Sequence, residues 1–177
     1  PYYSPFKSDG SLASIEDGSW TGSGQNPLEW LENNPISFKK YKVISSVFAE
    51  LTLYKNLVFR SQFGVDFSHT TGFSQSFPEY APNLGDGQAS RSSTDALALQ
   101  VSNTLTYRFA IDDLHDFNFL LGQEALSSHG ERFSVSTAGQ TNNNLTDVAT
   151  GTRAKSWSST STADYATVSF FGRGEYS

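Results

Sequence analysis

Alternation of apolar and polar side chains along Leu57 to Ser68 is the feature that most constrains the fold of this chain. The apolar members stand mostly at odd positions, and polar or small residues separate them. Successive side chains of an extended strand point to opposite sides, so a period of two predicts a β-strand with one apolar and one polar face. A helix would repeat its apolar residues every three or four positions instead. The apolar face must therefore lie against either a protein core or a lipid bilayer.

The same alternation recurs along the chain and predicts an all-β fold. The predicted strands cover approximately 41–53, 57–76, 95–109, 116–137 and 163–177. Short turns alternate with the long loops 77–94 and 138–161, an asymmetry typical of outer-membrane barrels, which carry tight periplasmic turns and long extracellular loops. Soluble strands usually run about 5 or 6 residues, whereas crossing a bilayer at a tilt takes roughly 9 to 11. The predicted strands reach the longer figure.

Composition excludes several other classes of protein. The 177 residues contain no run of 18 apolar residues, so no transmembrane helix is predicted, as expected if lumen-facing residues dilute the lipid-facing ones. Twelve basic and 18 acidic residues give a net charge of -6, which argues against a nucleic-acid surface and predicts no nucleic-acid partner. The absence of cysteine excludes disulfides and thiolate metal sites.

Residues 1–40 are expected to form an extracellular loop region with one short helical turn. Within this region only Pro27 to Glu32 has a helical pattern, with Asn26 as its cap and Pro27 at its first position. The long loops are rich in Ser, Thr, Asn and Gly and contain few apolar anchors, so they are predicted to be solvent-exposed.

No catalytic, metal or cofactor site is predicted. The segment from Asp112 to Asp116 holds several potential metal ligands, but it lies in a predicted tight turn, where Asp is common for backbone reasons. The three histidines have no recognisable serine or cysteine nucleophile motif nearby. Paired carboxylates such as Glu124 and Glu131 cannot be placed face to face from sequence. We therefore expect a protein that is not an enzyme.

Three tryptophans fall in predicted loop regions and are candidates for contact with a ligand or partner: Trp20, Trp30 and Trp157. Their flat rings could support a sugar ring or a peptide side chain. Packing within the loops is the competing interpretation, so the sequence leaves both open.

Four segments of the chain, in their order, resemble the barrel of SusC/RagA-type TonB-dependent outer-membrane transporters. They are SGQNPLEWLENN (Ser23 to Asn34), LYKNLVFRSQFGVDFS (Leu53 to Ser68), FNFLLGQEAL (Phe117 to Leu126) and FFGRGEYS (Phe170 to Ser177). The resemblance implies antiparallel up-and-down strands that form part of a large transmembrane β-barrel, of about 22 strands in that family. The family's plug, its TonB box and the remaining strands are missing here, so the chain is expected to be a barrel segment.

The resemblance also implies a function and a place in the cell. It implies import of large nutrients, glycans or peptides, across the cell outer membrane of a Gram-negative type of bacterium. The implied partners are a SusD-like surface lipoprotein, TonB acting through the absent plug region, and outer-membrane lipid. A soluble β-sandwich that binds carbohydrate is the alternative, and a structural or adhesive β-protein is a third.

On this interpretation, one set of alternating side chains faces lipid and the other set faces a wet lumen. Placing Arg60 toward lipid instead would cost about 2 to 4 kcal/mol at the bilayer midplane, which fixes the register. The residues predicted to face lipid are Phe59, Phe63, Val65, Phe67, Leu97, Leu99, Val101 and Leu105.

Overall fold

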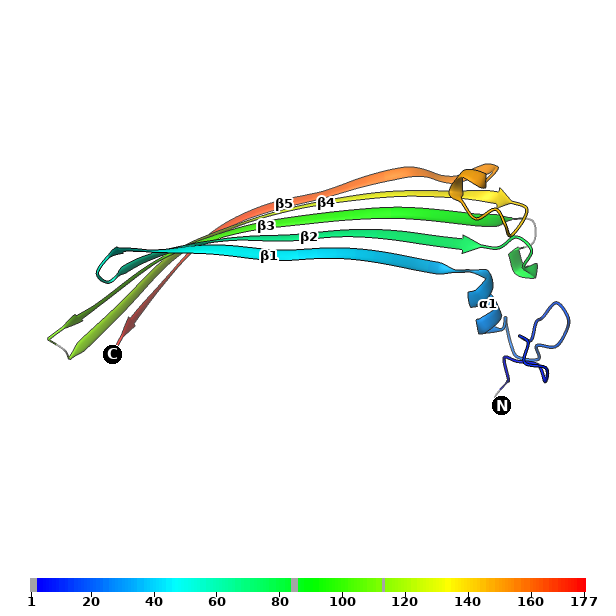
Figure 1. The fold of residues 1–177 in the computed structure, drawn as a ribbon, viewed down its shortest axis with the longest axis horizontal. Coiled ribbons are helices and arrows are strands. Elements are labelled where there is room, and N and C mark those ends of the chain that lie inside the picture. Colours follow the sequence, from blue (N-terminus) through cyan, green and yellow to red (C-terminus); the bar gives the residue numbers. More distant parts are fainter. Residues whose placement is uncertain (1–2, 84–85, 113) are drawn as a thin grey trace. The chain divides into compact units, whose positions relative to one another are not determined.

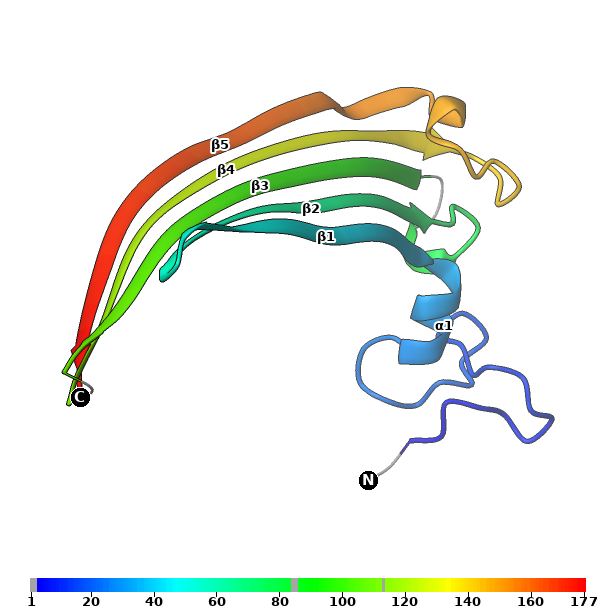
Figure 2. The same cartoon turned by 60° about the vertical axis from the view of Figure 1, so that its left-hand side comes forward.

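A single antiparallel sheet of five strands forms the fold (Figure 1). The computed structural model describes residues 3–83, 86–112 and 114–177, although the side chains of 81 and 155–160 fall outside the description. Each strand pairs with the next one along the chain, and Figure 2 shows the same order from a second direction. The strands are β1 (Ile36–Tyr54), β2 (Leu57–Ser76), β3 (Gly87–Ile111), β4 (His115–Gln140) and β5 (Arg153–Tyr176). The predicted all-β, up-and-down fold is confirmed.

The strands extend further than the alternation predicted. β3 begins at Gly87 instead of near residue 95, and β5 begins at Arg153 instead of near residue 163. The loops that join β2 to β3 and β4 to β5 are correspondingly shorter than the predicted 77–94 and 138–161. The added strand residues are mostly Ser, Thr, Gly and charged residues, which carry no apolar alternation although their backbones continue the strands.

Two tight turns join the first and second pairs of strands. Residues 55–56 connect β1 to β2, and the backbone N–H of Arg108 on β3 reaches the carbonyl oxygen of Asn56 at 3.0 Å. In the turn between β3 and β4, Asp112 has a φ of 54°, a left-handed conformation that Asp tolerates better than most residues. The backbone role predicted for this acidic segment therefore fits the geometry.

The chain divides into two compact units, and every strand contributes residues to both. Unit 1 comprises residues 1–39, 70–93 and 133–160 and contains the long connections. Unit 2 comprises residues 40–69, 94–132 and 161–177 and contains the tight turns. The buried apolar side chains of the described residues all belong to unit 1, namely Ala13, Tyr80, Ala89 and Ala138. Unit 2 is thus one layer of sheet that has no buried apolar core in its described part.

The predicted short helix is confirmed and forms part of unit 1. Helix α1 (Pro27–Asn33) begins after Asn26, whose side-chain oxygen accepts a hydrogen bond from the Leu28 N–H at 3.1 Å. Asn26 is fully buried, and its side-chain amide donates to the carbonyl oxygens of Pro5 at 2.8 Å and Ala13 at 2.7 Å. One amide side chain therefore caps the helix and ties it to the N-terminal segment.

No helix in the described part of the chain is long and apolar enough to cross a membrane.

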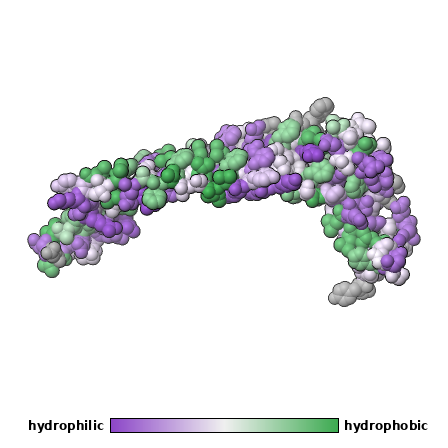
Figure 3. Space-filling model, in the orientation of Figure 1, coloured by the Kyte–Doolittle hydropathy of each residue, from purple (hydrophilic) through white to green (hydrophobic). Residues whose placement is uncertain are grey.

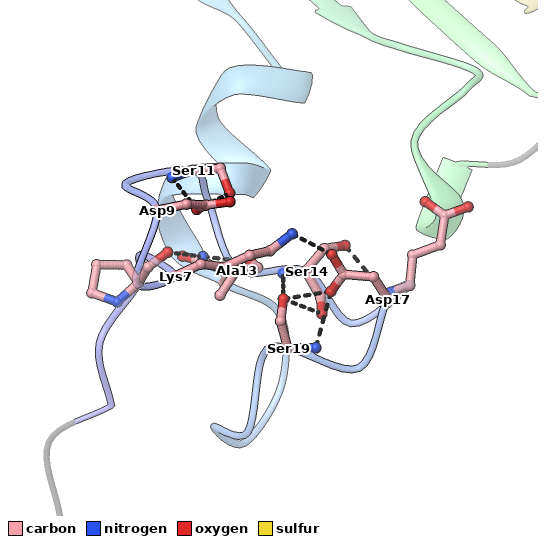
Figure 4. A network of polar contacts seen from close by, with 10 residues as sticks. Lys7, Asp9, Ser11, Ala13, Ser14, Asp17 and Ser19 are labelled. Atoms are coloured by element: carbon pink, nitrogen blue, oxygen red, sulfur yellow. Dashed lines mark hydrogen bonds and ion pairs between the residues drawn. The ribbon is translucent and has the colours of Figure 1, made fainter.

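Polar contacts hold the N-terminal segment of unit 1 in place (Figure 4). The carboxylate of Asp17 accepts hydrogen bonds from the Lys7 ammonium and from the hydroxyl and backbone N–H of Ser19. Because Lys7 and these Ser19 groups favour the charged carboxylate, the pKa of Asp17 lies well below its usual value. Asp9 forms a similar short turn with Ser11, whose hydroxyl holds the pKa of that carboxyl below its usual value.

Similar contacts join the connections on the β3 to β5 side of unit 1. Arg91 pairs with Asp147 at 3.1 Å, and Arg153 pairs with Asp86. The pKa of Asp147 is lowered, chiefly by the backbone N–H of Ala149, which the carboxylate caps at the start of a short helical turn, Val148–Thr150. These pairs lie at exposed positions, so they orient the loops more than they stabilise them.

Candidate functional site: the two faces of unit 2

Even-numbered residues of β1 to β4 share one face of unit 2, which we call the polar face. Lys42 on β1 pairs with Asp66 on β2 at 3.0 Å, and the amide of Gln100 on β3 donates to Glu124 on β4. The guanidinium of Arg60 lies over a ring on β1, 4.3 Å from its centroid. Contacts between side chains require them to project to the same side, so the polar face extends from β1 to β4.

Odd-numbered residues of the same strands project to the other side, which we call the apolar face. His69 on β2 contacts Asp95 on β3 at 2.5 Å. This contact shows that the odd residues of β2 and β3 share a side. The eight residues predicted to face lipid are all odd-numbered members of these strands: Phe59, Phe63, Val65, Phe67, Leu97, Leu99, Val101 and Leu105. No second layer covers them within the described residues, and Phe63 is 41% exposed.

On β5 the even-numbered residues belong to the apolar face. The backbones of Asp116 and Ser177 exchange two hydrogen bonds, of 2.8 and 3.1 Å, which set the register of β5 against β4. In the same register, the ring nitrogen of His129 lies 2.5 Å from Asp164. The alternation along β5 therefore places Val168 on the apolar face. Figure 3 shows apolar side chains exposed along the strands, between groups of polar ones.

Aromatic rings gather on the apolar face near the tight turn between β3 and β4. Phe109 on β3 stacks on Phe117 of β4 with a centroid distance of 5.0 Å, and Phe117 contacts the ring of Tyr176 on β5 at 5.2 Å. The hydroxyl of Tyr176 lies 2.7 Å from a ring nitrogen of His115. Aromatic residues with a polar tip are typical of the girdles that flank the apolar band of membrane barrels. The composition of this cluster fits a membrane-water boundary.

Two amide side chains interrupt the apolar face. The side-chain amide of Asn103 on β3 donates to the side-chain oxygen of Gln123 on β4 at 2.8 Å, and both residues are half-buried. Asn103 lies between Val101 and Leu105, in the middle of the apolar residues of its strand. The hydrogen bond lowers the cost of placing either amide in an apolar environment. Sequence alternation gave no indication that the two amides pair.

Two of the grooves on the polar face differ in charge. One has a volume of about 450 Å³ and is lined by carboxylates that have partners, Asp66 and Glu124. The other has a volume of about 540 Å³ and lies next to the tight turn between β1 and β2. Its charged lining residues are Glu50, Lys55, Arg60 and Arg108. The second groove thus has an excess of positive charge.

The structure places the three candidate tryptophans in different surroundings. The indole N–H of Trp20 donates to the carbonyl oxygen of Gly24 at 2.9 Å, and its ring lies 6.1 Å from that of Tyr3. Trp30 belongs to α1 and is 40% exposed. The backbone of Trp157 lies in β5 instead of a loop, because that strand begins early, and its side chain is outside the described residues. Among the described side chains, Trp20 and Trp30 make no ring contact with each other, and ligand contact stays a prediction.

Among the described residues, no group of three His, Asp or Glu side chains is arranged to hold a metal ion. The three histidines point to separate partners: His69 to Asp95, His129 to Asp164 and His115 to Tyr176. None of these pairs includes a serine or cysteine.

Comparison with solved structures gives three similar chains. This chain superposes on a structure titled "Structure of the RagAB peptide transporter" with a TM-score of 0.85 and 26% identity, covering 99% of this chain and 20% of that one. The "closed-closed" state of the RagAB peptide importer gives a TM-score of 0.84 with 26% identity, and its "open-open" state 0.84 with 27%; both have the same coverages.

The resemblance found in the sequence is confirmed. The chain has the fold of a SusC/RagA-type barrel segment. It spans about one fifth, 20%, of the length of the similar structures, which are transporters. No protein-family model and no curated protein sequence matches the chain.

Proposed function

We propose that this chain forms part of the wall of a TonB-dependent outer-membrane transporter. The observation that carries the proposal is that unit 2 is a single layer of long strands with an apolar and a polar face. In agreement with it, 99% of the whole chain superposes on a peptide transporter. A sheet with no second layer must cover its apolar face with something else, and in a barrel wall lipid tails do so.

In this proposal the apolar face contacts outer-membrane lipid and the polar face lines the lumen. The strands run from 19 to 26 residues, which exceeds the roughly 9 to 11 needed to cross a bilayer. The surplus lies in the polar strand ends of unit 1, which we assign to the extracellular side together with residues 1–40. The polar face provides hydrogen-bonding and charged groups along the path of a solute.

The substrate and partners follow from the resemblance. The similar structures are named as peptide transporters or importers, so we propose peptide import for the complete protein, with glycan import as the alternative. The family implies a SusD-like surface lipoprotein at the extracellular side and TonB acting through a plug. The β-sandwich that binds carbohydrate is the less favoured candidate, because the described residues supply one sheet only.

Accessibility of single cysteines in intact membranes tests the orientation of the two faces. Four variants of the complete transporter each carry one introduced cysteine. Phe63→Cys and Leu99→Cys lie on the apolar face, and Gln62→Cys and Ser102→Cys lie on the polar face. A membrane-impermeant maleimide should label Gln62→Cys and Ser102→Cys and leave Phe63→Cys and Leu99→Cys unlabelled. Detergent denaturation should then make all four react. Equal labelling of both faces before denaturation would contradict the proposal.

A further inference from the structure

The cationic groove of the polar face is built by the tight turn between β1 and β2 and by the facing part of β3. Lys55 and Asn56 belong to the turn, and the carbonyl oxygen of Asn56 accepts a hydrogen bond from the backbone N–H of Arg108 at 3.0 Å. That bond fixes Arg108 beside the turn. The groove therefore lies on a rigid element, where a tight turn and a strand ladder position its charged groups.

The guanidinium groups of the groove lack a carboxylate partner. Arg60 contacts the face of the Phe48 ring, and the Nε of Arg108 donates to the side-chain oxygen of Asn118 at 3.4 Å. Neither Arg nor Lys55 lies within ion-pair distance of a carboxylate among the described residues. Arg60 is thus held through a ring contact and Arg108 through one N–H, so further guanidinium N–H groups stay available to an acceptor.

The rest of the lining suits a carboxylate as well. Thr104 and Thr106 supply hydroxyl groups to the lining, and Val58 and Leu120 supply apolar contacts. Glu50 is the one carboxylate that lines the groove in the described structure, against three cationic side chains. Charge-assisted hydrogen bonds from arginine to carboxylate are stronger than neutral ones, and apolar neighbours reduce their competition with water.

The groove lined by Asp66 and Glu124 differs from the cationic groove in the state of its charges. There Asp66 has Lys42 as its partner, and Glu124 accepts from Gln100, so its carboxylates are already bound. One groove therefore has carboxylates with an ion-pair or hydrogen-bond partner, and the other has cationic side chains that pair with no carboxylate among the described residues. The difference depends on the side chains that line each groove.

From this arrangement we infer that the cationic groove binds a carboxylate of a polypeptide, with Arg60 and Arg108 as its principal ligands. The inference rests on the proposed function, because only there does the polar face line a transport path. The carboxylate can come from a transported peptide or from a segment of the transporter's own chain inside the lumen. Both sources present the same chemical group, and the experiment separates them.

Peptide binding to the complete, purified transporter tests the first source. The probes are a fluorescent pentapeptide with two aspartates and a free carboxyl terminus, and its neutral counterpart with asparagines and an amidated terminus. We expect Arg60→Gln or Arg108→Gln to weaken binding of the acidic probe about three- to tenfold and to leave the neutral probe unchanged. Arg132→Gln removes the same charge from the polar face outside the groove, and it should change neither affinity by more than about twofold.

Photo-crosslinking tests the second source in the same protein without added peptide. A photoreactive amino acid at Thr104 should then attach to an acidic segment of the transporter's own chain, and Arg60→Gln should reduce that product. The inference is overturned if the acidic and neutral probes bind equally, the arginine variants change neither, and no acidic segment is crosslinked. Cysteine labelling at Gln62 and Phe63 reports separately on the orientation of the faces, so failure here is distinguishable from failure of the transporter proposal.

Discussion

The ring of Phe171 on β5 lies over Gly122 on β4, its neighbour across the sheet. A Cβ atom at position 122 would overlap the ring, so the glycine provides the space that the aromatic side chain fills. In the same register, a Cβ built at Gly172 would lie 3.4 Å from the Leu121 side chain on the opposite side of the sheet. Phe171 therefore belongs to the polar face, although it is aromatic.

Removal of the Phe171 ring should destabilise the sheet, and a methyl group at position 122 should partly compensate. Phe171→Ala uncovers the backbone at Gly122, and we expect a loss of about 1 kcal/mol in the free energy of unfolding. Adding Gly122→Ala to that variant fills part of the space and strengthens the strand. Urea unfolding of the complete barrel in lipid vesicles measures both. A double variant no more stable than Phe171→Ala would contradict this account.

The relation between Phe171 and Gly122 also shows what the sequence could and could not predict. Alternation placed the residues of β2 and β3 on their two faces because each strand carries its own pattern. On β5 the aromatic residues Tyr165 and Phe171 made that pattern ambiguous. The residue that shows which face Phe171 occupies is Gly122 on the neighbouring strand. Only the register of β4 against β5 places Phe171 next to Gly122.

The strand ends and the cationic groove illustrate the same limit. The mostly polar residues from Gly87 to Thr94 extend β3 because their backbones pair with a neighbouring strand, which no side-chain period reports. The groove depends on Arg60 and Arg108, which are 48 positions apart in sequence and meet only through the pairing of β2 with β3. By contrast, helix α1 was predictable, since Asn26 and Pro27 are local signals.

The paired amides of Asn103 and Gln123 should be coupled in stability. Asn103→Leu alone leaves the Gln123 amide without its partner in an apolar environment, which should cost about 1 to 2 kcal/mol. Replacing both with leucine removes the polar groups together and should be nearly neutral. A double-mutant cycle from unfolding in lipid vesicles measures the coupling. Additive losses from the two single variants would show that the hydrogen bond contributes nothing there.

Loss of the buried Asn26 side chain should free both the start of α1 and the N-terminal segment. Asn26→Ala removes the helix cap and the donor to two carbonyl oxygens, one buried and one part-buried, with an expected cost of about 2 to 4 kcal/mol to this part of unit 1. Asn26→Ser keeps a capping oxygen and loses the two donations, so its effect should be intermediate. Protease cleavage within residues 3–26 reports the change. Equal cleavage of the native protein and Asn26→Ala would refute the role.

The contacts of Asp17 predict how the N-terminal segment responds to pH. Its folded-state pKa lies below the ordinary value of 3.8, chiefly because Lys7 donates to the carboxylate. A carboxyl group with a depressed pKa contributes stability above its unfolded-state value, and that contribution is lost as pH falls through the folded-state value. The segment should therefore keep its structure from neutral pH down to about pH 4 and loosen only in stronger acid.

Fluorescence of Trp20 measures this response, because its backbone N–H bonds the carbonyl oxygen of Ser14 at 2.9 Å, within the segment that Asp17 organises. Trp30→Phe and Trp157→Phe remove the other two indoles. Asp17→Asn cannot carry the charge, so we expect its Trp20 emission at pH 7 to match that of the acid form and to change little on acidification through the range in which the native protein undergoes its transition. Asp9→Asn is the control: it removes a carboxylate bound to Ser11, away from Ser19, and should keep the acid transition. A transition of unchanged size in Asp17→Asn would assign it to another carboxyl group.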